Sequence, residues 1–187
     1  MKLFYSTLLI IYLSIPSLVK SETMSDLIWD NGLYYKNGSK NPFNGIITGE
    51  INGSFINGKK NGKWTRHYKN GKLFSISNYH LGLKNGDWAT FNKIGLYIEK
   101  GKYKNDLEEG KWIRFFDNGE VNYKGEFVNG KKTGVWTSYY KNGQLEYKGS
   151  FRDGKKEGIW EYYFSNGNKN YEFSGIFENG KKISKNL

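Results

Sequence analysis

Residues Gly134 to Gly158 read GVWTSYYKNGQLEYKGSFRDGKKEG, and this pattern recurs on both sides of the stretch. Tryptophans recur every 24 residues, and a glycine stands two positions before each of them. The tryptophans are Trp64, Trp88, Trp112, Trp136 and Trp160, and the glycines are Gly62, Gly86, Gly110, Gly134 and Gly158. A fixed period of this size is typical of repeat proteins, in which each unit packs on its neighbours. We therefore expect one continuous array.

Each unit of the array is predicted to form a β-hairpin. Residues 135–140 are rich in aromatic and β-branched side chains, and residues 145–151 alternate apolar and polar ones. Asn142-Gly143 stands between these runs, and such a pair favours a two-residue type I′ turn, in which both residues need positive φ. This turn predicts the cross-strand pairs Tyr140 with Leu145, Ser138 with Tyr147, and Trp136 with Gly149.

The predicted pairing gives the hairpin two unlike faces. Gly149 lies opposite Trp136, where its missing side chain leaves room for the indole to lie flat across the neighbouring strand. Gly101 and Gly125 stand at the same place in earlier units. The other face is more polar, so we expect one buried and one solvated face. The predicted buried face carries Trp136, Ser138, Tyr140, Leu145 and Tyr147.

Two stretches of the array resemble a known family. YKGEFVNGKKTGVW, from Tyr123 to Trp136, and YKGSFRDGKKEGIW, from Tyr147 to Trp160, are similar to MORN repeats, and the order GxWxxYYxNGxLxYxGxF resembles the bacterial variant. The resemblance runs from about Gly45 to the C-terminus. It implies an all-β fold, an elongated single-layer antiparallel sheet of tandem β-hairpins. It also implies association with membranes and protein assemblies, although it says little about activity.

The remaining segments suggest an exported protein with a capped array. Residues 1–21 combine Lys2, a mainly apolar run and a small-residue cleavage site, which is typical of a secretory signal peptide. An uncleaved membrane anchor is the alternative. Residues 22–45 are interpreted as an N-terminal cap with two short strands around Asn31-Gly32, and residues 46–187 as the repeat array. The chain has no cysteine, which excludes disulfides, and its net charge of +11 would fall to +9 after cleavage.

The sequence shows no pattern typical of a catalytic, cofactor or metal site. Its two histidines, His67 and His80, have no cysteine or carboxylate at a metal-ligand spacing. Asp106, Glu108 and Glu109 form the only dense acidic group, but they lack the alternating spacing of a calcium loop. We therefore predict that the protein is not an enzyme and binds neither a metal nor a cofactor.

Lysine pairs recur at equivalent turns and would line one long edge of the sheet. These residues are Lys59, Lys60, Lys131, Lys132, Lys155, Lys156, Lys181 and Lys182. An edge of this kind could meet anionic lipid headgroups or a cell-wall polymer, each lysine adding about 1 kcal/mol at low salt. The simpler interpretation is that these lysines keep an aromatic-rich sheet soluble.

Three functions remain open at this point. The first is a noncatalytic scaffold of the cell envelope that binds a protein partner or an anionic surface. The second is an antitoxin or immunity-type protein that neutralises a partner toxin. The third is a cell-wall carbohydrate-binding module, although the repeats of such modules are shorter. Nucleic acid is not the expected partner of an exported protein, and self-association through an edge strand stays open.

Overall fold

The computed structural model describes residues 21–184, and nearly all regular structure in them is β-strand. Apart from Ser21, the predicted signal peptide (residues 1–21) lies outside the described residues. Met24–Asp26 forms a short 3₁₀-helix. The strands are β1 (Leu27–Asp30), β2 (Leu33–Lys36), β3 (Gly45–Ile47), β4 (Ile51–Ile56), β5 (Lys59–His67), β6 (Leu73–His80), β7 (Leu83–Phe91), β8 (Tyr97–Lys104), β9 (Leu107–Phe115), β10 (Val121–Val128), β11 (Lys131–Tyr139), β12 (Leu145–Arg152), β13 (Lys155–Tyr162), β14 (Gly175–Glu178) and β15 (Lys181–Ser184).

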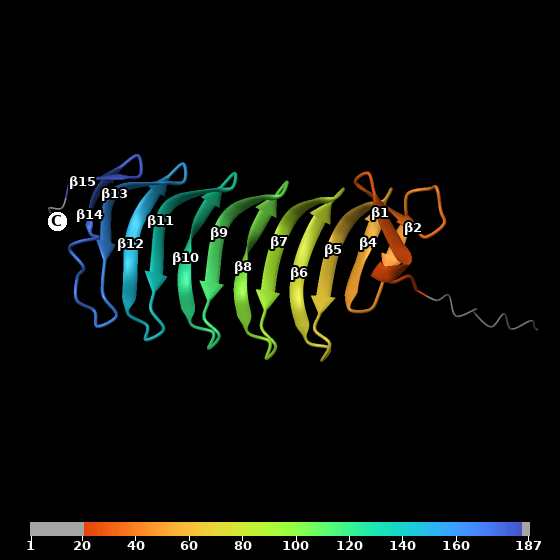
Figure 1. Ribbon diagram of the computed structural model, residues 1–187, viewed down its shortest axis with the longest axis horizontal. Coiled ribbons are helices and arrows are strands. Elements are labelled where there is room, and N and C mark those ends of the chain that lie inside the picture. The colour runs from red at the N-terminus through yellow and green to blue at the C-terminus, as the bar shows by residue number, and fades with distance from the viewer. Residues whose placement is uncertain (1–20, 185–187) are drawn as a thin grey trace, which may run out of the picture.

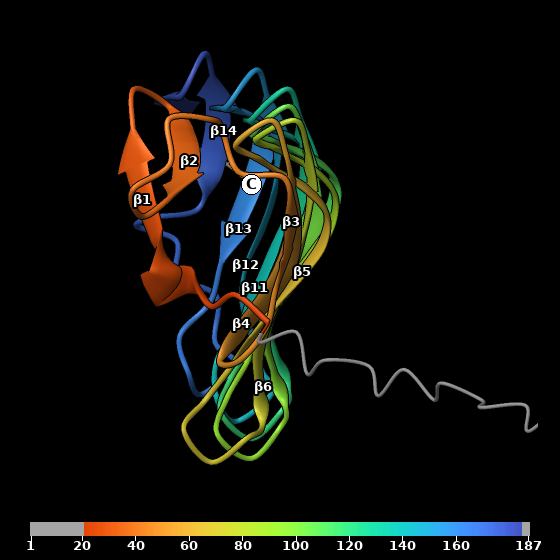
Figure 2. The same ribbon diagram turned by 90° about the vertical axis from the view of Figure 1, so that its right-hand side faces the viewer.

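Strands β3 to β15 form one 13-stranded antiparallel sheet in which sequence neighbours are spatial neighbours throughout. Figure 1 shows this sheet as a single row of hairpins along the long axis of the molecule. The predicted fold class, an elongated single layer of tandem hairpins, is confirmed. The sheet is also bowed, and the β1–β2 hairpin lies on its hollow side (Figure 2). We call the face that carries the tryptophans the inner face and the opposite one the outer face.

The two edges of the sheet use different turns, and the prediction for Asn142-Gly143 is wrong. Only Gly143 of that pair has positive φ, and the Gly143 amide donates to the carbonyl of Tyr140 while the Tyr140 amide donates to the carbonyl of Gln144. This is a three-residue loop, a type I turn closed by a left-handed glycine. The side chain of Asn142 favours it, because its Oδ1 accepts the amide of Gln144 at 3.1 Å.

Two-residue turns with positive φ at both positions lie at the other edge instead. They are Asn31-Gly32 in the N-terminal hairpin and, in the main sheet, Asn57-Gly58, Leu81-Gly82, Asn105-Asp106, Asn129-Gly130, Asp153-Gly154 and Asn179-Gly180. These φ values are those of type I′ turns, whose twist matches that of the flanking strands. Every unit therefore contains a type I′ turn. This turn joins one predicted hairpin to the next and does not lie within a predicted hairpin.

The longer loop also corrects the predicted faces of the hairpin. Ser138 pairs with Tyr147 and Trp136 with Gly149, as predicted, but Tyr139 pairs with Leu145 across a register shift. The extra loop residue is absorbed by a bulge at Glu146. Leu145 therefore lies on the outer face, and Glu146 lies on the inner face, where one of its carboxylate oxygens accepts the Ser138 hydroxyl at 2.6 Å.

Four of the five repeat indoles, those of Trp64, Trp112, Trp136 and Trp160, cover a glycine, but of the preceding strand and not of the following one. A Cβ on Gly149 would lie 2.2 Å from Cδ2 of Trp160, and one on Gly125 would lie 2.2 Å from Cδ2 of Trp136. The predicted placement of Trp136 over Gly149 is therefore wrong. The indole lies over Gly125 because of Gly134. The φ of +60° at Gly134 belongs to a bulge in β11, and this bulge tips the next side chains toward β10.

The buried core is a row of aromatic side chains along the inner face. Trp64, Trp112, Trp136 and Trp160 are at most 5% exposed, whereas Trp88 is half-buried. Trp88 faces Ser77, which replaces the glycine of the other units, and its ring stacks on Trp112 with centroids 5.4 Å apart. A side chain beneath the indole is therefore accommodated by a different packing.

Residues 22–45 cover the first strands of the array. Tyr34 packs on Phe55 with ring centroids 4.9 Å apart, and both belong to a cluster that contains Ile47 and Trp64. The Tyr34 amide also donates to the carbonyl of Gly58. The β1–β2 hairpin thus shields the aromatic row where no preceding repeat exists.

Candidate functional site

The predicted lysine row is divided between two environments. Lys59, Lys131, Lys155 and Lys181 are exposed at the type I′ turns. Their neighbours Lys60, Lys132 and Lys156 fold onto the inner face, where the ammonium groups lie 4.6, 4.1 and 4.7 Å from the tryptophan rings of their own units. Lys182 follows a different course, because its ammonium donates to the carbonyl of Glu172. Only the first lysine of each pair is therefore free to meet a partner.

The inner-face lysines have a structural role, and their burial changes their pKa. Burial lowers the pKa of Lys60, of Lys132 and of Lys156, with Lys84 adding to the effect at Lys60. A cation over an indole is attracted by the ring's negative face. These three side chains thus close the aromatic row from solvent.

Polar groups on the inner face form one network around Glu99. Oε1 of this carboxylate accepts both the Trp112 indole N–H at 2.8 Å and the Tyr123 hydroxyl at 2.9 Å, and Arg114 lies 3.6 Å from its other oxygen. Burial and the hydrogen bond to Glu99 raise the pKa of Tyr123 to about 12. The network therefore supplies hydrogen-bond partners to partly buried polar groups, which is a structural role rather than a catalytic one.

Exposed aliphatic side chains accompany the exposed lysines, and the sequence analysis did not identify them. Three type I′ hairpins place an aliphatic residue directly across from a lysine: Ile56 with Lys59, Leu107 with Lys104, and Val128 with Lys131. Ile56, Leu81, Leu83, Leu107 and Val128 are each 43% to 50% exposed. The signal that could have found them is the position directly beside each two-residue turn, where a side chain has no third strand to pack on.

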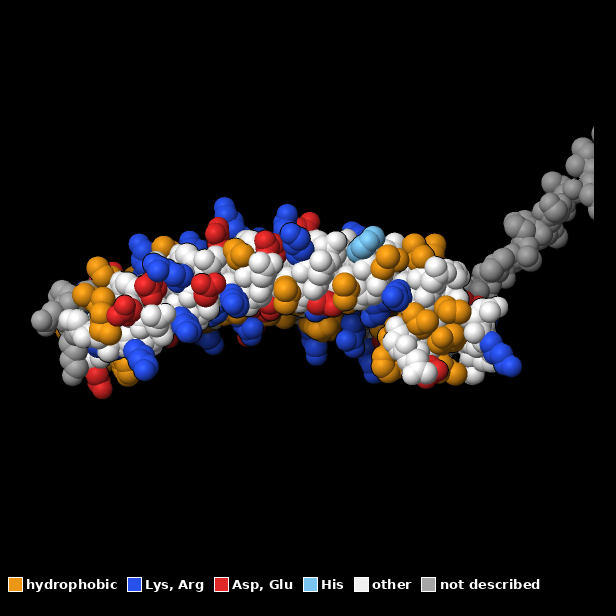
Figure 3. All heavy atoms as spheres, turned by 90° about the horizontal axis from the view of Figure 1, so that it is seen from above, with side chains coloured by type: hydrophobic (Ala, Val, Ile, Leu, Met, Phe, Trp, Pro, Cys, Tyr) orange, Lys and Arg blue, Asp and Glu red, His pale blue; other side chains and the backbone are white. Residues whose placement is uncertain are grey.

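We call this surface the turn edge: the six type I′ turns of the main sheet and the residues beside them. Figure 3 looks onto it and shows lysine and arginine side chains along its length with hydrophobic side chains between them. The opposite edge, made of the three-residue loops, carries Lys69, Lys72, Lys93 and Lys141 with Asp117 and Glu120, and the turn edge carries Asp106, Asp153 and Glu178 among its lysines. Its exposed aliphatic residues, Ile94 and Leu96, come from a single loop. Both edges thus carry more lysine and arginine than acidic side chains, and the turn edge is the more apolar of the two.

The described residues hold no arrangement suited to a metal or a spanning helix. Within residues 21–184, no three His, Cys, Asp or Glu side chains come together in a possible metal site. No helix in that same range is long and apolar enough to cross a membrane.

These features define a class of protein, an open repeat sheet that offers surfaces for binding. The family model of the MORN repeat variant matches residues 60–80, 108–129, 132–153 and 156–176. The chain therefore belongs to the MORN-variant repeat proteins, which are generally noncatalytic binding scaffolds. Residues 81–107 fall between the matched repeats, yet β7 and β8 continue the sheet. No curated protein matches the chain.

Proposed function

We propose that the protein is a noncatalytic scaffold of the cell envelope that docks on an anionic phospholipid surface through its turn edge. The envelope location rests on the signal-peptide pattern of residues 1–21. Docking by one edge leaves both broad faces of the sheet free for a protein partner. The observation that carries the proposal is the pairing of an exposed aliphatic side chain with a lysine at three of the six type I′ turns of the main sheet.

Each of the two residue types makes a different contribution to such docking. A lysine near an anionic surface contributes about 1 kcal/mol at moderate salt. An aliphatic side chain that enters the headgroup region contributes about 0.8 kcal/mol for each buried CH₂ group. Lysines needed only for solubility would not require exposed Ile56, Leu107 or Val128 across from them.

The turns themselves suit a contact along a line. Successive type I′ turns are separated by two strands, which is roughly 9 to 10 Å. Because every turn projects from the same edge, several of them can reach a flat surface at once. Weak individual contacts then add, since binding of the first turn holds the next ones near the surface.

Co-sedimentation of the full chain with phospholipid vesicles tests the proposal. We expect binding to phosphatidylglycerol vesicles that weakens as salt is raised, and little binding to phosphatidylcholine vesicles. Lys59→Gln with Lys131→Gln should reduce binding, because it removes two turn-edge charges. Lys69→Gln with Lys141→Gln removes the same charge from the opposite edge and should have a much smaller effect.

A second pair of variants tests the aliphatic contribution. Leu83→Ser with Leu107→Ser should weaken vesicle binding, whereas Ile94→Ser, on the opposite edge, should not. Equal losses for the two edges would overturn the assignment to the turn edge. Absence of vesicle binding, together with capture of one salt-resistant protein partner, would favour the scaffold or immunity interpretation without a membrane.

A further inference from the structure

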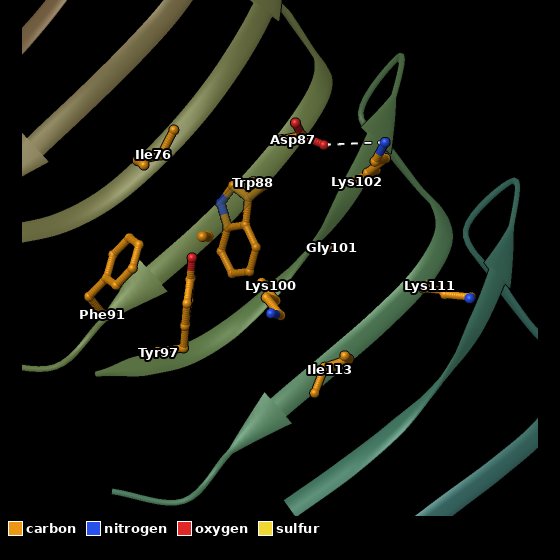
Figure 4. Close-up of a pocket in the computed structure, with 11 residues that line it drawn as sticks. Ile76, Asp87, Trp88, Phe91, Tyr97, Lys100, Gly101, Lys102, Lys111 and Ile113 are labelled. Carbon is orange, nitrogen blue, oxygen red and sulfur yellow. Dashed lines mark ion pairs between the residues drawn. The ribbon is translucent and has the colours of Figure 1, made fainter. Parts of the chain in front are cut away.

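The outer face contains a trough that the turn edge does not include. A hollow of about 360 Å³ is lined by residues of β6 to β9, among them Ile76, Ala89, Lys100 and Ile113. Figure 4 shows these strands and the side chains around the hollow. A second hollow of about 480 Å³ begins at Ile113 and continues to Thr137 on β11. The two hollows share Lys111 and Ile113 and so adjoin along a line that crosses the strands; we call them together the trough.

The floor of the trough is one cross-strand row of the sheet. Ala89 pairs with Lys100, Lys100 with Ile113, Ile113 with Lys124, and Lys124 with Thr137. Thr137 in turn pairs with Lys148. Lysines thus stand on every second strand, and next-nearest strands are roughly 9 to 10 Å apart. Short or apolar side chains lie between them, so the charges are evenly spaced along a smooth floor.

An aromatic wall lines one end of the trough and is formed by Phe91 and Tyr97, on which Phe115 packs. The rings of Phe91 and Tyr97 lie 4.7 Å apart, and those of Tyr97 and Phe115 lie 5.9 Å apart. The ammonium of Lys100 lies 4.7 Å from the Tyr97 ring centroid. Next along the row, the ammonium of Lys124 lies 5.9 Å from the Tyr139 ring centroid. Lys100 and Lys124 therefore each have an aromatic ring beside the ammonium group.

The charge of the trough is positive and only partly balanced. Its acidic groups are Asp87, which pairs with Lys102 at 3.4 Å, and Glu126, the cross-strand partner of Lys111. Among residues 21–184, neither Lys100 nor Lys124 has a carboxylate within ion-pair distance. The floor lysines thus have no carboxylate that competes with an anionic ligand; Lys124 is exposed, and the Lys100 ammonium rests over the Tyr97 ring.

We propose that this trough binds a linear polysaccharide that carries a carboxylate on every second sugar ring. Such a polymer presents its charges at an interval comparable to the lysine spacing, and the C–H faces of its rings can lie against the aromatic wall. Its hydroxyl groups stay in water, which suits a shallow trough. The proposal concerns a site separate from the turn edge and does not depend on membrane docking.

Two other extended ligands fit the trough less well. An extended peptide is usually held by main-chain hydrogen bonds to a sheet edge, but the strands of the trough are interior, and each is paired on both sides. Single-stranded nucleic acid is held by bases that stack on aromatic rings. Phe91, Tyr97 and Phe115 already pack side by side, which leaves no room for a base between them.

Calorimetric titration of the full chain with an oligosaccharide of alternating glucuronic acid and N-acetylglucosamine tests the proposal. Its methyl ester, which has the same length but no charge, is the matched ligand control. We expect binding of the acid form only. Lys100→Gln with Lys124→Gln should weaken it about tenfold or more, the loss that accompanies removal of charge-assisted contacts.

The turn-edge variant Lys59→Gln with Lys131→Gln is the matched protein control, because it changes the net charge equally. It should bind the oligosaccharide with nearly unchanged affinity. The proposal is overturned if the acid form does not bind, if the methyl ester binds equally well, or if both double variants lose affinity to the same degree. Tighter, Lys100-dependent binding of a single-stranded oligonucleotide or an acidic peptide would also overturn it.

Discussion

At the scale of single residues, the fold depends on a missing side chain beneath four of the five repeat indoles. Trp160 is 1% exposed, and it lies where a Cβ on Gly149 would otherwise stand. An indole is large and rigid, so it covers a strand closely only where that strand has no side chain. The period of 24 therefore couples a tryptophan to a glycine on the neighbouring strand.

Replacement of this glycine should be among the most damaging small changes in the array. For Gly149→Ala we expect the free energy of unfolding to fall by about 3 kcal/mol, the upper end for over-packing, because the buried indole must shift. Urea denaturation measures this value. Ser77→Ala is the control, since Ser77 occupies the equivalent position and already has a Cβ. Equal losses for both variants would contradict the packing of Trp160 on Gly149.

Removal of a central indole should also cost much of the stability. Trp136 is 0% exposed, so Trp136→Ala is expected to lower the free energy of unfolding by about 3 to 5 kcal/mol. Trp29 is 63% exposed, and Trp29→Ala should stay within about 0.5 kcal/mol. Melting curves of the two variants provide the comparison. An unchanged melting temperature for Trp136→Ala would be incompatible with a buried inner face.

The raised pKa of Tyr123 predicts a specific loss of stability in alkali. Its folded-state pKa of about 12 exceeds the ordinary value of 10.0. The folded protein therefore binds this proton more tightly than the unfolded chain, and the resulting stability is complete below pH 10 and lost as the pH rises toward 12. Tyr123→Phe should flatten this decline, and ultraviolet titration should lose a phenol that ionises near 12. A phenol ionising near its ordinary value would contradict the burial beside Glu99.

The residue pattern alone predicted the row of buried tryptophans, but it placed Leu145 on the wrong face and did not predict which glycine an indole covers. A strict alternation of faces places Trp136 opposite Gly149, and that pairing is present. The left-handed bulge at Gly134 then turns the indole toward Gly125. Bulges of this kind are not apparent from alternation, although a glycine two positions before every tryptophan was their signal.

At the scale of elements, the two turn types give each hairpin its register. Asn-Gly occurs at both edges, and the sequence analysis assigned the type I′ turn to the wrong one. The local difference is the residue that takes positive φ: Asn129 and Gly130 both do, whereas only the glycine of Asn142-Gly143 does. The hydrogen bond that the Gln144 amide donates to Oδ1 of Asn142 competes with the type I′ geometry. The turn propensity of Asn-Gly alone does not reveal this competition.

Proline substitutions separate the two turns experimentally. Lys141 is the first loop residue of a type I turn, where proline is favoured, so Lys141→Pro should change the free energy of unfolding by less than about 1 kcal/mol. Asn129 has a φ of +49°, which proline cannot adopt, so Asn129→Pro should cost about 3 kcal/mol or more. Denaturant titration provides both values. A large loss of unfolding free energy for Lys141→Pro would contradict the three-residue loop and support a two-residue turn at Asn142-Gly143.

At the scale of the whole molecule, repetition turns single positions into continuous surfaces. The lysine row was predictable because Lys-Lys pairs recur with the repeat. The division of this row between an exposed and a buried environment was not predictable, since the folding of Lys132 over Trp136 depends on the twist and bulges of the strands. The exposed Leu83 and Leu107 were missed because they occur in the units that depart most from the repeat pattern.

The outer-face lysines were missed for a different reason. Lys100, Lys124 and Lys148 recur every 24 residues, but they lie on the face predicted to be polar and were not predicted as a site. The sheet register brings them into one row with Ala89 and Ile113. A functional surface of a repeat protein is thus defined by pairing across units more than by motifs within one.

Site-specific fluorescence most directly tests the central claim, docking through the turn edge. The chain contains no cysteine, so Val128→Cys and Gln144→Cys each allow an environment-sensitive label at one edge. With phosphatidylglycerol vesicles, we predict a blue shift and salt-sensitive brightening for the label at position 128 and no change at position 144. A shift of equal size at both positions, or at position 144 alone, would contradict docking by the turn edge.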